Sequence, residues 1–392
     1  MAVAGAGAFG RNHLRVYREL ETAGEGVALV AAVEPDAARA NEAGKQYKIP
    51  VFSSVEKLLA ADLNLHAASV AVPTVYHHAV ATQLLDAGLD LLVEKPLAAN
   101  LAEADDLIAR AETAGRIIQP GHLERFNPAV LAVAQRITRP MFFEAHRLSV
   151  FTPRSLDVDV VLDLMIHDLD IVLTFAASPV REVRAVGLPI LSPKVDIANV
   201  RVEFESGCVA NFTASRVSTE RVRKLRFFEP RQYVSIDYAR RDVLVIRIDD
   251  APAASRDPLA ALPANVRSMI PAHIAAAIAA GTFDLSKIDP AMIAQFARMA
   301  GVDPAVVAQV TAQLSAPGGP APGLSFAKPE VAPGEPLRLE ILSFLESVRN
   351  RTEPVVTARQ GRAALALALE IQAAMEAHAE RAGLRDFFHP GA

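Results

Sequence analysis

Three glycines near the start of the chain constrain its fold more than any other feature. Gly5, Gly7 and Gly10 are spaced as G-x-G-x-x-G directly after the apolar residues Ala2–Ala4, and apolar side chains at helical spacing follow them. This order predicts a strand, a glycine turn and a helix. In such a unit the first glycine permits a tight turn and the second lets the backbone approach a pyrophosphate. The third brings the helix close to the strand, so a dinucleotide site is expected here.

An acidic residue after the next predicted strand supports a dinucleotide site. Residues 27–33 (VALVAAV) predict a buried parallel strand, and Glu34 follows it. A carboxylate at this position hydrogen-bonds the adenosine ribose and repels a 2′-phosphate, so we expect NAD rather than NADP. The alternative is a glycine turn in an α/β domain without a nucleotide. The residues expected to bind NAD in this first part are Gly5, Gly7, Ala8, Phe9, Gly10 and Glu34.

Strands and helices alternate up to about residue 120, which predicts an α/β fold whose N-terminal domain (1–120) is a doubly wound parallel sheet. Ligands bind beyond the carboxyl ends of such strands. The residues that follow two further strands therefore join the expected NAD site: Pro73, Thr74, His77, Glu94, Lys95 and Pro96. From residue 121 to 392, several consecutive strands predict an α+β domain with a large, mostly antiparallel open sheet. A proline- and alanine-rich insertion, residues 251–323, interrupts it.

Composition excludes several classes of protein. The net charge of −5 provides no basic surface for nucleic acid. No apolar run approaches the roughly 18 residues of a membrane span. The single cysteine, Cys208, suits a reducing compartment, and with no signal peptide at the N-terminus we expect a cytoplasmic protein. The histidines, such as His77 with His78, show no metal-ligand spacing, so no metal is expected.

Three residues have the chemistry of a dehydrogenase. Lys95 lies where the nicotinamide should be, and its ammonium can stabilise a developing alkoxide. His167 lies in an apolar helix with Asp163 one turn before it, which is the arrangement of a general base with an orienting acid. The alternatives are a surface lysine beside Glu94 and a hydrogen-bonded core histidine.

Polar residues are dense in the turn after the last parallel strand. His122, Glu124, Arg125 and Asn127 are candidates for substrate contact, with a helix-capping cluster as the alternative. The basic run of residues 216–226 alternates with apolar residues and is interpreted mainly as a solvated strand edge. It could also hold a substrate phosphate.

Five stretches of the sequence carry a family resemblance: GAGAFG (5–10), VPT (72–74) before His77, EKP (94–96), GHLERFNP (121–128) and DLMIHDLD (163–170). Together they make the chain resemble the Gfo/Idh/MocA oxidoreductases. The resemblance implies an NAD-binding Rossmann domain and a second domain whose open sheet makes homo-oligomer contacts, in a dimer or tetramer. It also implies that Lys95 is the catalytic lysine and that Asp163 and His167 form the acid–histidine pair.

Within that family, the chain resembles members that oxidise the 3-hydroxyl of UDP-N-acetylglucosamine. The resemblance implies a nucleotide-sugar substrate and a ketone product, which an aminotransferase converts to a 2,3-diamino sugar for lipid A or surface polysaccharide. Two alternatives stay open: a dehydrogenase of a free sugar or inositol, and a non-catalytic regulator that senses NAD or sugars. The stretches are 121–130 (GHLERFNPAV), 225–242 (LRFFEPRQYVSIDYARRD) and 334–348 (GEPLRLEILSFLESV).

Overall fold

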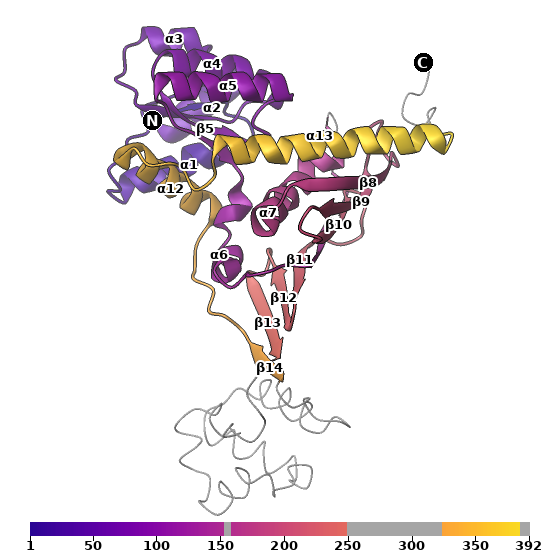
Figure 1. Cartoon of the computed structure of the whole chain (residues 1–392). Coiled ribbons are helices and arrows are strands. Elements are labelled where there is room, and N and C mark those ends of the chain that lie inside the picture. The colour runs from indigo at the N-terminus through magenta and orange to yellow at the C-terminus, as the bar shows by residue number, and fades with distance from the viewer. Residues whose placement is uncertain (153–157, 249–323, 385–392) are drawn as a thin grey trace, which may run out of the picture. The chain divides into compact units, whose positions relative to one another are not determined.

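The computed structural model describes residues 1–152, 158–248 and 324–384 (Figure 1). The chain divides into two compact units. One comprises Met1–Pro230, Val234–Leu244 and the chain from Lys328 onward, and the other comprises Arg231–Tyr233 and Val245–Ala327. The predicted insertion, residues 251–323, lies outside the described residues.

Six parallel strands form the first sheet, which confirms the predicted doubly wound domain. Their order is β3-β2-β1-β4-β5-β6, the order of a dinucleotide-binding sheet. The strands are β1 (Ala2–Ala4), β2 (Ala31–Val33), β3 (Val51–Phe52), β4 (Ala67–Val70), β5 (Asp90–Glu94) and β6 (Ile118–Gly121).

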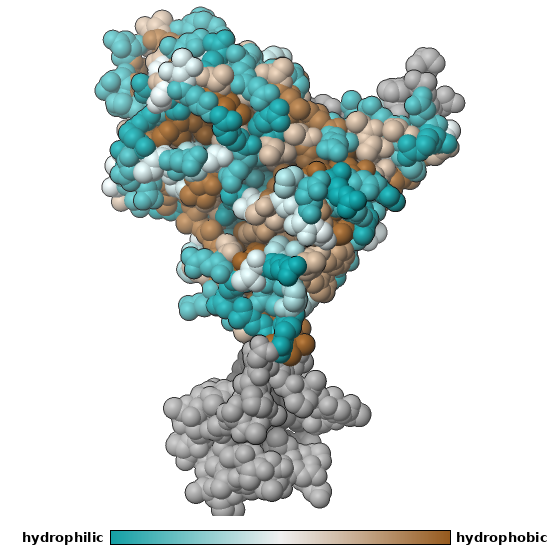
Figure 2. Space-filling model, viewed as in Figure 1, coloured by the Kyte–Doolittle hydropathy of each residue, from teal (hydrophilic) through white to brown (hydrophobic). Residues whose placement is uncertain are grey.

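Helices cover both faces of this sheet, because alternate side chains of each buried strand point to opposite faces. One face packs on α3 (Val55–Ala60), α4 (His77–Asp86) and α5 (Leu101–Ala114). The other packs on α1 (Gly10–Thr22), α2 (Ala37–Tyr47) and, from far along the chain, α12 (Pro336–Asn350). In Figure 2 these helices present mostly hydrophilic residues outward, with hydrophobic residues between them.

The second sheet is mostly antiparallel, as predicted. The strands that lie wholly or partly in the first unit are in the order β13-β12-β11-β7-β10-β9-β8. The pair β7–β10 is parallel, and the pairs β11–β7, β10–β9 and β8–β9 are antiparallel. The strands are β7 (Phe142–Leu148), β8 (Val180–Leu188), β9 (Ile197–Phe204), β10 (Val209–Ser215), β11 (Val222–Glu229), β12 (Gln232–Asp237) and β13 (Asp242–Ile248).

One expectation about this sheet is wrong. The basic run 216–226 does not form a sheet edge, because β11 lies between β12 and β7. Arg216, at the start of the run, is buried and its Nε donates to Asp196 at 2.7 Å.

Two helices pack on the second sheet. A π-helical turn, Val161–Met165, leads directly into α7 (Ile166–Ala176). The long helix α13 (Ala358–Arg381) runs past α7 and along β8 (Figure 1). Its N-terminus has a capping box in which Thr357 and Gln360 exchange hydrogen bonds. The short helix α6 (Pro128–Ala134) follows β6 after a 3-10 turn.

The second unit contains one further described strand. β14 (Leu324–Ala327) pairs antiparallel with residues 245–248 of β13. Among the helices that the structure describes, none is both long and apolar enough to cross a membrane.

Candidate active site

The glycine turn has the geometry of a phosphate-binding loop. Gly5 has φ +96°, and a Cβ there would lie 2.5 Å from the carbonyl oxygen of Ala71. A Cβ on Gly10 would lie 1.9 Å from the Gly5 carbonyl oxygen, so the start of α1 packs directly on the turn. A Cβ on Gly7 would meet nothing within 4 Å of the described chain. The turn therefore leaves Gly7 open to approach, which is what a pyrophosphate-binding turn requires.

Glu34 is buried directly after β2 and stabilises the glycine turn through a hydrogen bond. Its Oε2 accepts a hydrogen bond from the Ala6 amide at 2.9 Å, and its Oε1 accepts one from the Asp36 amide at 3.0 Å. The half-exposed Arg39 also donates to Oε1 at 3.0 Å. The predicted contact with the adenosine ribose would use the acceptor capacity that these bonds leave.

The carboxyl ends of the parallel strands gather the other residues expected to bind NAD. Phe9 is exposed in the glycine turn, and Pro73 and Thr74 begin a 3-10 turn after β4. The His77 ring is buried, with Nδ1 2.8 Å from the Pro96 carbonyl and Nε2 2.9 Å from the Val72 carbonyl. Burial lowers the pKa of His77 although both carbonyls favour its protonated form. His77 thus fixes the chain after β5 to the end of β4.

Glu94 points into the protein rather than toward the open rim. Its Oε1 lies 2.8 Å from His13 Nε2, and His13 Nδ1 lies 3.2 Å from the Ser69 hydroxyl. Tyr17 contacts the same hydroxyl at 2.8 Å. His13 was not among the residues predicted from the sequence to lie near Glu94. The available clue was its spacing from Tyr17, four residues on, which places both on the buried face of α1.

Lys95 reaches from the end of β5 to the π-helical turn. Its Nζ donates to the Asp163 carbonyl at 2.7 Å and lies 3.9 Å from the Asp163 carboxylate. Burial lowers the pKa of Lys95, while Asp163 and Glu94 act in the opposite direction. The Lys95–Pro96 peptide bond is cis. The structure thus brings together two of the predicted catalytic residues from segments that lie far apart in sequence.

His167 lies in the first turn of α7, close to this pair. Burial lowers the pKa of His167 well below its usual value, and the charges of Lys95 and Arg147 lower it further. Its Nδ1 is buried and has no hydrogen-bond partner in the described part of the chain. Asp163 makes its contact with Lys95, and no hydrogen bond from Asp163 to His167 is present among these residues. The orientation of His167 by Asp163 stays a prediction.

The polar turn after β6 is largely engaged by the protein itself. His122 is buried, with Nδ1 4.0 Å from the Asp170 carboxylate. Arg125 donates to Thr174 and to the Val355 carbonyl. These bonds hold the turn against α7 and the segment before α13.

The contacts of Glu124 and Asn127 are those of a helix-capping cluster, the alternative to substrate contact. The Asn127 amide donates to Glu124 at 2.9 Å, and the Asn127 side-chain oxygen accepts from the Ala129 amide at the start of α6. The other oxygen of Glu124 accepts from Arg147 at 3.0 Å. Their contact with substrate, like that of His122 and Arg125, remains untested.

Arg147 is the main residue of the site region that sequence analysis missed. It is fully buried on β7, and its Nε and one terminal nitrogen donate to Asp168 at 2.7 and 2.9 Å. Its guanidinium carbon lies 5.1 Å from the centre of the Tyr238 ring. A paired, hydrogen-bonded arginine of this kind is stable in a core. The sequence clue was a charged residue in the inward phase of an alternating strand.

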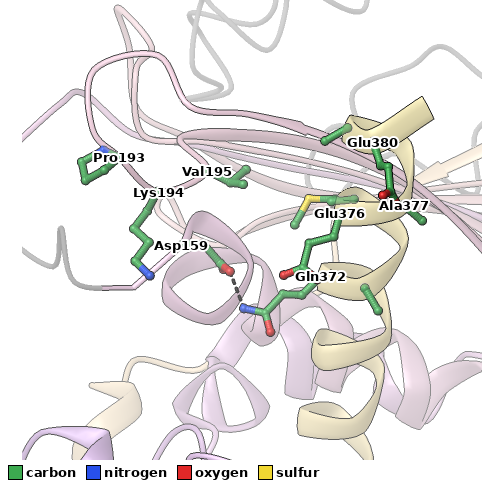
Figure 3. Close-up of a pocket in the computed structure, with 11 residues that line it drawn as sticks. Asp159, Pro193, Lys194, Val195, Gln372, Glu376, Ala377 and Glu380 are labelled. Atoms are coloured by element: carbon green, nitrogen blue, oxygen red, sulfur yellow. Dashed lines mark hydrogen bonds between the residues drawn. The ribbon is translucent and has the colours of Figure 1, made fainter. Parts of the chain in front are cut away.

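A separate pocket of about 620 Å³ opens beside the π-helical turn (Figure 3). Gln372 of α13 donates to one Asp159 oxygen, and the other accepts from the amides of Val161 and Leu162 at 2.8 and 3.0 Å. Asp159 therefore holds the start of the turn that carries Asp163. None of the residues predicted to bind cofactor or substrate lines this pocket.

Comparisons with known proteins show the family to which the chain belongs. Residues 1–122 match the GFO/IDH/MocA oxidoreductase family, NAD-binding Rossmann fold, and residues 130–230 match the GFO/IDH/MocA C-terminal domain. A UDP-N-acetylglucosamine 3-dehydrogenase of Acidithiobacillus ferrooxidans is 35% identical over 285 residues, which are 69% of this chain and 88% of the relative. The chain belongs to the GFO/IDH/MocA oxidoreductase family. The predicted family is therefore confirmed, as are an oxidoreductase activity and NAD as cofactor.

Other relatives show the breadth of the GFO/IDH/MocA family. A scyllo-inositol 2-dehydrogenase (NAD(+)) of Bacillus subtilis is 26% identical over 232 residues, covering 55% of this chain and 67% of the relative. Among solved structures, GnnA, the UDP-N-acetylglucosamine 3-dehydrogenase of A. ferrooxidans, has a TM-score of 0.73 at 28% identity. The match covers 96% of this chain and 97% of GnnA.

No group of three or more histidine, cysteine, aspartate or glutamate side chains could hold a metal ion within residues 1–152, 158–248 and 324–384. Lys95 pairs with Asp163, and Arg147 pairs with Glu124 and Asp168.

Proposed function

We propose that this protein oxidises the 3-hydroxyl of UDP-N-acetylglucosamine to a ketone, with NAD as the oxidant. The observation that carries the proposal is the similarity to the A. ferrooxidans UDP-N-acetylglucosamine 3-dehydrogenase over 88% of that relative's length. The convergence of Lys95, Asp163 and His167 supports it, because these groups have the chemistry that oxidation of an alcohol requires.

In this mechanism His167 accepts the hydroxyl proton. Its lowered pKa keeps the imidazole neutral, and therefore able to accept a proton, at neutral pH. Lys95 donates a hydrogen bond to the alcohol oxygen and stabilises the alkoxide character of the transition state. Asp163 holds the Lys95 ammonium in place through its carbonyl and carboxylate. When bound, NAD would supply the acceptor for the hydride of the carbon that bears this hydroxyl.

The cofactor would be held by the rim of the first sheet. The open approach at Gly7 would admit the pyrophosphate, and Glu34 would face the ribose. The chain from Pro73 to His77 and the Glu94–Pro96 segment would border the nicotinamide. These assignments follow from the position of the residues at the carboxyl ends of β1, β2, β4 and β5.

A second candidate substrate is inositol or a free sugar, since an inositol dehydrogenase is among the relatives. A non-catalytic sensor is disfavoured by the presence of both Lys95 and His167.

We also propose a cytoplasmic homo-oligomer that associates through the second sheet, with domains bounded near residue 120. The ketone would serve an aminotransferase that makes a 2,3-diamino sugar.

The deciding experiment is NADH formation with UDP-N-acetylglucosamine, N-acetylglucosamine, UDP-glucose and myo-inositol. We expect turnover with the first at a kcat/KM at least tenfold above the others. A higher value with myo-inositol or the free sugar would replace the nucleotide-sugar proposal. No NADH with any of them would favour the sensor.

A further inference from the structure

Arg223 lies on the helix-covered face of the second sheet. In the antiparallel pair of β11 and β7, Arg223 is opposite Arg147, and Phe227 is opposite Phe143. Residues two apart on a strand share a face, so Arg223 and Phe227 point to the same side of the sheet. The Phe227 ring lies 6.2 Å from Phe175 in the last turns of α7, which identifies that side as the α7 side.

The same register places Arg223 near the start of α7. Arg147, its cross-strand neighbour, is bonded to Asp168, the residue after His167. Phe227 marks the far end of the helix, so the sheet follows α7 from Phe175 back to its first turn. In agreement, the charge of Arg223 lowers the pKa of both His167 and Lys95.

Arg223 differs from Arg147 in that it forms no direct ion pair in the described residues, and the carboxylates of Glu124 and Asp168 act on it only from a distance. Arg147 has two carboxylate partners, Glu124 and Asp168. Arg223 is partly buried, and its Nε is buried without a hydrogen-bond partner in the described residues. A buried cation beside another cation is costly unless an anion or acceptor approaches it. Burial, followed by the Arg147 charge, accordingly lowers the pKa of Arg223.

The neighbouring basic residues of β11 do not share this position. Lys224 and Arg226 alternate with Arg223 and point to the opposite face of the sheet. Arg226 pairs there with Glu144 at 2.9 Å. Because side chains alternate along β11, its basic residues are divided between the two faces of the sheet. Arg223 points to the face that carries the candidate active site.

We propose that Arg223 binds a phosphate group of the sugar nucleotide whose sugar ring reaches Lys95 and His167. This inference rests on the proposed function and narrows it, because it assigns the recognition of the diphosphate to one residue. A guanidinium donates up to five hydrogen bonds in a plane and matches the geometry of phosphate oxygens. A bound anion would supply the direct partner that Arg223 lacks in the described residues.

The test measures binding of UDP to the NAD-loaded enzyme by calorimetry, for wild type, Arg223→Gln and Lys224→Gln. We expect Arg223→Gln to weaken UDP binding about tenfold to a hundredfold, the scale of a charged hydrogen bond. Lys224→Gln, one residue along on the opposite face, should bind UDP as the wild type does. NAD affinity should be equal in all three. Equal UDP affinity in Arg223→Gln and wild type would overturn the proposal.

Two further measurements keep the inference separate from the proposed function. Arg223→Gln should raise the KM for UDP-N-acetylglucosamine more than it lowers kcat. If wild type oxidises this substrate and the variant has an unchanged KM, the inference fails and the function stands. If wild type oxidises no nucleotide sugar, the function fails, and UDP affinity still decides whether Arg223 is an anion site. Should Arg223→Gln not fold, Arg223→Ala and Arg223→Lys provide the same comparison, with Lys retaining part of the affinity.

Discussion

At the scale of single residues, the site is built from polar pairs that join distant parts of the sequence. Lys95 contacts Asp163, Glu94 contacts His13, and Arg147 contacts Asp168. Each pair joins different elements, so the position of each side chain depends on the whole fold. This explains why residue types near the strand ends were predictable whereas their partners were not.

The Glu34–Arg39 ion pair leads to a prediction about cofactor choice. Glu34→Ser should weaken NAD binding by about 1–3 kcal/mol, the scale of a charged hydrogen bond. It should also improve relative NADP use, because it releases Arg39 to meet a 2′-phosphate. Coenzyme titration of wild type and variant measures both. The double variant Glu34→Ser/Arg39→Ala should lose the NADP gain. A wild type that prefers NADP would contradict the role of Glu34.

The environment of His167 changes the expected pH profile. A histidine base alone predicts a rate that rises near neutrality. The lowered pKa of His167 moves that rise below pH 6.5. A histidine with a lower pKa is already neutral at a lower pH, and only the neutral imidazole can accept the hydroxyl proton of the substrate. Lys95→Ala and His167→Ala should each lower kcat about 10²–10⁴-fold with modest change in KM.

The acid limb of the profile is the pH range over which kcat rises as His167 loses its proton, and the two variants should change this limb differently. Lys95→Ala removes one of the charges that lower the pKa of His167, so its limb should move toward higher pH. In His167→Ala the limb should be absent. Profiles of log kcat against pH from 5 to 9 (roughly the range where histidine titrates) test this. An unaltered limb and full turnover in His167→Ala would return this histidine to a structural role.

At the scale of elements, local patterns predicted most helices and strands but not their neighbours. The alternation in β7 and the helical stripe of α12 are visible in the sequence. That β7 pairs in parallel with β10, and antiparallel with β11, depends on long-range packing that no local period encodes. The π-helical turn before α7 was likewise missed, because its residues have the apolar pattern of an ordinary helix.

The glycine turn yields a matched pair of variants. Gly10→Ala should destabilise the protein by about 1–3 kcal/mol or more, because its Cβ would overlap the Gly5 carbonyl. Gly7→Ala should leave stability nearly unchanged, since its Cβ meets no described atom, yet should weaken NAD binding at least tenfold. Urea unfolding and NAD titration separate the two effects. Unchanged NAD affinity in Gly7→Ala would argue against a pyrophosphate at this turn.

At the scale of the whole molecule, helix α12 from the C-terminal part of the chain covers part of one face of the N-terminal sheet. Ile341 and Phe344 of α12 are fully buried in the same cluster as Leu14 of α1. We predict that a fragment of residues 1–122 alone exposes this face, aggregates and binds a hydrophobic dye. The same fragment with residues 334–352 attached by a flexible linker should be monodisperse and bind NAD. A well-behaved fragment without α12 would show that this helix is dispensable.

The return of α12 also sets an order of events during synthesis. The six strands leave the ribosome first, but about 230 residues separate β6 from the end of α12. At roughly 5–20 residues per second, the sheet then waits on the order of 10–50 s with one face incompletely covered. We predict that during that interval the nascent chain exposes the apolar surface that α12 covers in the folded protein, a kind of surface that chaperones bind. Abundance of this protein in the cell should therefore respond to translation speed across residues 122–350.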